Sequence, residues 1–118
     1  MQQQFPPHAE KVVDGLLKES IPCISAITEI ELLCWKTATQ KDLDVLSNFI
    51  KDVLVIELEQ AIKYKTAEIR KAVRIKLPDA IIAATALVHN LTLVTRNAKD
   101  FNHISALPTI NPWEPSAN

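Results

Sequence analysis

The sequence predicts a single α/β domain in which a parallel sheet is flanked by helices. Short apolar, β-prone runs alternate with longer segments of helical periodicity, in the order helix, strand, helix, helix, strand, helix, helix, strand. A length of 118 residues suits one ordinary domain, and 47% of the residues are hydrophobic, which is enough for a core. No internal repeat or linker divides the chain, so residues 1–118 are predicted to form one domain, with 1–7 as a loose lead-in and 111–118 as a tail.

The first part of the chain is predicted to contain three helices and a strand. Residues 8–19 and 40–52 have the apolar spacing of amphipathic helices. The run 21–25 is β-like, and Ser25 can cap a helix over 26–36. The helix over 26–36 contains Ile27, Ile30, Leu33 and Trp35. In the helix over 40–52 the side chains expected to face inward are Leu43, Leu46, Phe49 and Ile50.

The second part is expected to hold the most buried helix. In chain order, the predicted elements are a strand over 53–58, a helix over 59–74, a helix over 78–89, a strand over 91–95 and a short strand near 109–110. Pro78 suits the first position of the helix over 78–89. That helix is apolar on nearly all sides, and its alanines allow close approach to a sheet, so we expect it to be buried.

Composition excludes several classes of function. The 13 basic and 14 acidic residues nearly balance, so no global charge attracts nucleic acid or membrane, and a nucleic-acid role would need a local basic patch. A single glycine rules out a glycine-rich phosphate loop. Cys23 and Cys34 are too few and too far apart for a zinc site. Without a recognisable signal peptide or apolar membrane span, the expected location is the cytoplasm, where both thiols would be free.

Polar residues that flank the predicted strands are candidates for a metal site. In parallel α/β sheets, active sites lie at the carboxyl ends of strands. Glu31 follows the first strand, Asp79 opens the buried helix, and Asn97 and Asp100 follow the strand over 91–95. Carboxylate and amide oxygens are the ligands of hard cations such as Mg²⁺ or Mn²⁺, which can orient a phosphodiester and activate water.

Each candidate also has a purely structural interpretation. Glu31 follows Thr28 by three positions, which is the spacing of a capping box. Asp79 at a helix start gains from the helix dipole, which would equally keep it ionised as a ligand. Asn97 and Asp100 could be turn residues. From the residues alone, the sequence indicates an α/β domain with an acidic cluster and no more.

Basic residues are concentrated in one segment. From 61 to 77 they outnumber acidic residues six to one, and they are Lys63, Lys65, Arg70, Lys71, Arg74 and Lys76. Three of them, at 63, 70 and 74, share a helix face. The segment is either a solvated helix, with Glu59 and Lys63 as an i,i+4 pair, or a phosphate-contacting surface that leads to Asp79 and is extended by Arg96 and Lys99.

Three runs resemble the acidic segments of the PIN-domain family, and of its VapC-like toxins in particular. They occur in order with sensible spacing, and they are ISAITEIELL (24–33), KLPDAIIAATA (76–86) and LTLVTRNAKDF (91–101). The resemblance maps two family acids onto Glu31 and Asp79. It maps another onto Asp100, because Asn97 is followed by an acidic residue three positions on. It covers the chain from about residue 8 to the end.

The resemblance implies a PIN-like three-layer sandwich and an Mg²⁺- or Mn²⁺-dependent endoribonuclease, the toxin of a VapBC-type pair. Glu31, Asp79 and Asp100 would be catalytic and metal-binding, with Asn97 as a further ligand. The candidate substrate-binding residues are Arg70, Arg74, Lys76 and Arg96. The implied partners are an RNA substrate, a VapB-like antitoxin whose tail blocks the site, and a second copy in a homodimer. The alternative is a non-catalytic PIN-like module that binds RNA or an antitoxin.

One family feature has no match. The family opens with a central strand that ends in aspartate, and the only early candidate, Asp14, lies too close to Glu31 for the family spacing. Either this strand lies upstream of Met1 or the chain has lost it, and the number of retained site residues favours the first explanation. The resemblance therefore implies weak or absent RNA cleavage by residues 1–118 alone.

Overall fold

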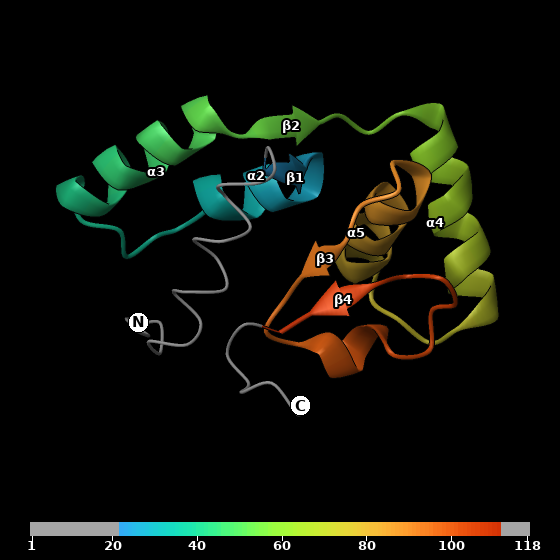
Figure 1. The fold of residues 1–118 in the computed structure, drawn as a ribbon. Coiled ribbons are helices and arrows are strands. Elements are labelled where there is room, and N and C mark those ends of the chain that lie inside the picture. The colour runs from blue at the N-terminus through green and yellow to red at the C-terminus, as the bar shows by residue number, and fades with distance from the viewer. Residues whose placement is uncertain (1–21, 112–118) are drawn as a thin grey trace.

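The structure, a computed structural model, describes residues 22–111 as helices and short strands (Figure 1). The elements are β1 (Cys23–Ser25), α2 (Ala26–Leu33), α3 (Gln40–Asp52), β2 (Leu54–Ile56), α4 (Gln60–Ala72), α5 (Leu77–Val88), β3 (Leu93–Val94), the 3₁₀ helix η1 (Ala98–Phe101) and β4 (Thr109–Ile110). Their order confirms the predicted α/β fold class over this range. The helix predicted over 8–19, the lead-in and Asp14 lie outside the described residues.

The strands form two parallel pairs. β1 pairs with β2, with Cys23 opposite Leu54, and β3 pairs with β4, with Leu93 opposite Thr109. Within residues 22–111 these pairs are separate two-stranded sheets, whereas the sequence led us to expect one sheet. The strands are also shorter than predicted, because α2 begins directly after β1 and leaves β2 only three residues to pair with.

One hydrophobic core joins both pairs. It contains Ile56 from β2, Ile62 from α4, and Phe101 from η1, and the half-buried Cys23 and Leu93 pack against it. Its centre is α5, where the alanines at 80, 83 and 84 are completely buried. These small side chains let α4 approach α5 closely, so α5 packs chiefly on α4 and also on β1 and α2. The helix expected to be buried is therefore the most buried of the described helices.

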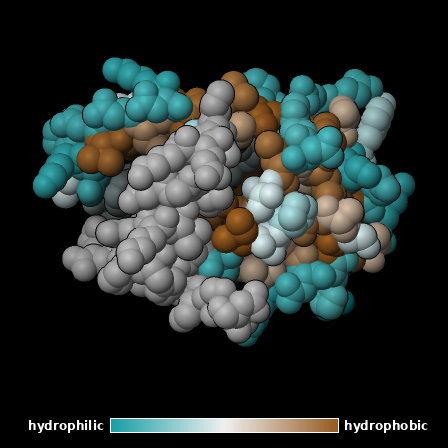
Figure 2. Space-filling model, in the orientation of Figure 1, coloured by the Kyte–Doolittle hydropathy of each residue, from teal (hydrophilic) through white to brown (hydrophobic). Residues whose placement is uncertain are grey.

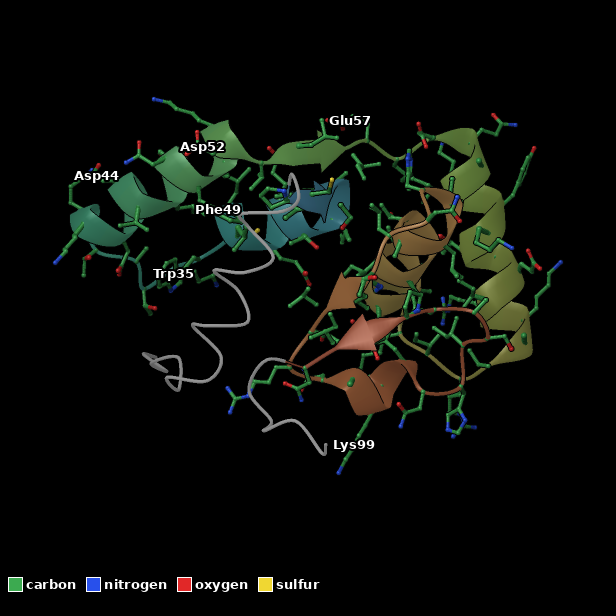
Figure 3. All side chains as sticks on the ribbon, viewed as in Figure 1. Trp35, Asp44, Phe49, Asp52, Glu57 and Lys99 are labelled. Carbon is green, nitrogen blue, oxygen red and sulfur yellow. The ribbon has the colours of Figure 1, made fainter. Side chains whose placement is uncertain are left out.

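Most of the predicted inward face of α3 is not buried. Of its four residues only Leu46 is buried, while Leu43 is 43% and Phe49 is 41% exposed. On the neighbouring α2, Leu33 is 66% exposed. Among the described elements, none packs extensively on α3. Trp35 and Phe49 lie on one side of α3, opposite Asp44 and Asp52 (Figure 3), and hydrophobic side chains reach the surface over this helix (Figure 2). We call the exposed side chains of Ile30, Leu33, Trp35, Leu43, Val45 and Phe49 the α2–α3 apolar surface.

Between residues 22 and 111, no helix combines the length and the apolar character that a membrane span needs.

Candidate active site

An acidic pocket of about 520 Å³ lies between α2, α5, β3 and η1. The candidate ligands Glu31, Asp79, Asn97 and Asp100 all line it, although they come from three separate segments of the chain. Apolar side chains, among them Ile82 and Phe101, complete the wall. These segments meet because α2, which follows β1, and η1, which follows β3, both pack on α5.

Glu31 reaches the pocket from the last half of α2. The helix is capped by Ser25, whose buried Oγ accepts the Thr28 N–H at 3.1 Å and lies 2.9 Å from Thr28 Oγ1. Ser25 thus acts as predicted, and the alternative of a Thr28–Glu31 capping box is wrong. The Glu31 carboxylate makes no hydrogen bond or ion pair with any other residue between 22 and 111.

Asp79 lies in the first turn of α5 and is half-buried. The N-cap of this helix is Lys76, and no side chain caps the exposed backbone N–H groups. Asp79 therefore does not cap the helix, and its carboxylate has no hydrogen-bond or ion-pair partner among the described residues. A carboxylate in the first turn also interacts favourably with the positive end of the helix dipole.

Asn97 and Asp100 are held by a tight backbone turn. The Asn97 N–H donates to Thr95 Oγ1 at 3.1 Å, and the Asp100 N–H donates to the Asn97 carbonyl at 3.0 Å. The buried Phe101 anchors this turn in the core. The turn interpretation is correct for the backbone, and it leaves the exposed Asp100 carboxylate without a partner in the described part of the chain.

The donor set suits a hard divalent cation. Carboxylate, amide and hydroxyl oxygens line the pocket, and no histidine or cysteine among the described residues does, so this donor set favours Mg²⁺ or Mn²⁺ over zinc. Within residues 22–111, no three His, Cys, Asp or Glu side chains are grouped closely enough to hold a metal ion by themselves. Mg²⁺ is usually bound by one or two carboxylates with water completing its shell, so the pocket fits an open, hydrated site better than a closed cage.

The candidate substrate-binding residues separate into different places. Lys76 lines the acidic pocket, whereas Arg70 and Arg74 line a second hollow at the end of α4. Arg96 lines neither, and its carbonyl accepts the Asn111 side-chain amide at 3.0 Å. Lys99 extends from η1 away from the rest of the fold (Figure 3).

Two threonines of the pocket were not among the predicted site residues. Thr28 and Thr95 line the wall, and each also makes a hydrogen bond that fixes the local backbone or its cap. In the sequence, Thr28 follows the first predicted strand and Thr95 ends the strand predicted over 91–95. These positions could have indicated a site, but hydroxyl residues are common beside strand ends for structural reasons alone.

Comparisons with known proteins identify close structural relatives. The model of the PIN domain family matches residues 6–107. A toxin–antitoxin complex from Klebsiella pneumoniae is 31% identical, with 89% of this chain and 87% of that chain covered and a TM-score of 0.69.

Two further solved structures are also similar. DNA-bound VapBC from Salmonella typhimurium is 27% identical, over 91% of this chain and 86% of that one, with a TM-score of 0.75. VapBC2 from Rickettsia felis, bound to a promoter DNA fragment, is 25% identical, with 92% of this chain and 87% of that chain covered and a TM-score of 0.74. No curated protein matches the sequence significantly.

Proposed function

Because the chain belongs to the PIN domain family, we propose that it is a divalent-metal-dependent endoribonuclease and the toxin of a VapBC-type toxin–antitoxin pair. The observation that carries the proposal is the acidic pocket. Glu31, Asp79 and Asp100 line it from three separate segments, and none has a partner among the described residues. Carboxylates with no internal partner suit the binding of a cation from solution.

Each residue of the pocket has a proposed role. Glu31 and Asp79 hold an Mg²⁺ or Mn²⁺ ion, and Asp100 or Asn97 orients a second ion or a water molecule. Lys76 neutralises a phosphate oxygen of the RNA. When bound, the ion polarises the phosphodiester and lowers the pKa of the attacking water.

Metal removal tests this function. The chain is dialysed against EDTA, then incubated with single-stranded RNA in the presence of EDTA, Mg²⁺, Mn²⁺ or Zn²⁺. We expect slow cleavage with Mn²⁺ or Mg²⁺ and none with EDTA, because the oxygen donors of the pocket require a hard ion to act. Cleavage that continues at the same rate in EDTA would contradict the proposal.

A second function is a non-catalytic module that binds RNA or an antitoxin. It is favoured by one observation: between residues 22 and 111, no three potential ligands are grouped closely enough to hold a metal ion unaided. The same assay separates the two functions. RNA that is bound but remains intact in every metal ion would support the module over the nuclease.

The proposed partners are an antitoxin and a second copy of the chain. The Klebsiella pneumoniae and Salmonella typhimurium relatives are toxin–antitoxin assemblies. The α2–α3 apolar surface supports a protein partner, because several large apolar side chains are exposed on these two helices, and exposed apolar patches often mark an interaction site. The proposed antitoxin segment covers this surface and the mouth of the acidic pocket, beside which α2 lies.

A further inference from the structure

A basic hollow of about 420 Å³ lies at the C-terminal end of α4, outside the acidic pocket. It is lined by Arg70, Lys71 and Arg74, together with the short segment that follows the helix. All three cationic side chains are exposed. The hollow therefore presents several positive charges to solvent at one place on the surface.

These charges are not neutralised within the described part of the chain. Arg70, Lys71, Arg74 and Lys76 form no ion pair there. The two acidic residues of the α4 segment contact other side chains: Glu68 lies 3.0 Å from Lys65, and Glu59 lies 2.8 Å from His89. The Glu59–Lys63 pair expected of a solvated helix does not form, because the Glu59 carboxylate contacts His89 instead.

The basic hollow and the acidic pocket are lined by neighbouring residues of the chain. Arg74 lines the hollow and Lys76 lines the pocket. Since only Ile75 separates them, their Cα atoms are at most about 7 Å apart. A polyanionic chain can thus contact both residues with adjacent phosphates.

We propose that the basic hollow is a second phosphate-binding site, which holds the RNA backbone beside the phosphate bound in the acidic pocket. The inference rests on the proposed nuclease function and adds a substrate class: single-stranded RNA long enough to span both sites. Arginine suits this role, because its planar guanidinium makes paired hydrogen bonds to phosphate oxygens. Basic residues at a helix C-terminus also stabilise the helix by interacting with its dipole, but this effect on stability does not depend on RNA.

Binding of a labelled RNA oligonucleotide, measured in EDTA over a range of salt concentrations, tests the inference. We expect the Arg70→Gln/Arg74→Gln variant to bind about tenfold more weakly at low salt. The slope of log affinity against log salt should become shallower by about 1.4, since each lost single-strand phosphate contact contributes about 0.7.

A charge-matched control removes two cations elsewhere. Lys41 and Lys51 of α3 are exposed and line neither the basic hollow nor the acidic pocket. The Lys41→Gln/Lys51→Gln variant should keep nearly the affinity and slope of the parent, and an equal loss in both variants would overturn the inference. If the double variant does not fold, the single Arg74→Gln variant provides the same test. Its slope of log affinity against log salt should change by half as much, because it removes one phosphate contact instead of two. Absence of metal-dependent cleavage would reject the nuclease but leave this measurement valid.

Discussion

Replacing Asp79 with asparagine is expected to lower the rate of RNA cleavage at least about 10²-fold, a loss typical of removing one preorganised electrostatic group from an active site. The substitution keeps the size of the side chain and removes its charge. Because the Asp79 carboxylate has no partner among the described residues and does not cap α5, its loss should not weaken the fold. Initial rates with saturating Mn²⁺ measure the effect, and thermal unfolding of both proteins verifies that the variant is folded.

Asp52→Asn is the matched control for this prediction. Asp52 ends α3, is exposed and does not line the acidic pocket (Figure 3). The control should cleave RNA at the rate of the parent. If Asp79→Asn also cleaves at that rate, Asp79 is not part of the catalytic machinery.

Replacing Ile62 with alanine is expected to lower the free energy of unfolding by about 2–5 kcal/mol. Ile62 is completely buried in α4, within the core formed with the alanines of α5. Those alanines are too short to fill the space that the isoleucine leaves, so a cavity should remain. Urea unfolding followed by circular dichroism measures the change.

Val45→Ala is the control for the stability prediction. Val45 is 63% exposed on α3, so its truncation removes little buried surface and should change the free energy of unfolding by well under the loss at Ile62. Similar values for the two variants would show that the α4–α5 contact is not the centre of the core.

The order of elements could be predicted because hydrophobic periodicity is a local property. The helix over 40–52 was predicted with the observed bounds, and Ser25 was identified as a cap from its position alone. Periodicity identifies an apolar face but not what covers it, and for this reason the inward position expected of Leu43 and Phe49 is wrong. The division into two sheets depends on strand pairing between distant segments, which no local pattern specifies.

Candidate site residues could be selected from the sequence because strand ends and helix starts are local features. Glu31, Asp79 and Asp100 line one pocket, while their roles as metal ligands remain a proposal. The sequence could not show that Arg70 and Arg74 line a hollow separate from that of Lys76, because helical spacing defines a face without locating the cavities beside it. The sequence also could not show that the Glu59 carboxylate contacts His89, thirty residues further along the chain, instead of Lys63.

Direct titration of Mn²⁺ into the metal-free chain, followed by calorimetry, tests the central claim that the acidic pocket holds a divalent cation. The parent chain should bind Mn²⁺, and Asp79→Asn and Glu31→Gln should each weaken binding at least about tenfold, because each removes a charged oxygen ligand. Asp52→Asn should bind as the parent does. Equal Mn²⁺ affinity in all four proteins, or no binding by the parent, would contradict a metal site built on these carboxylates.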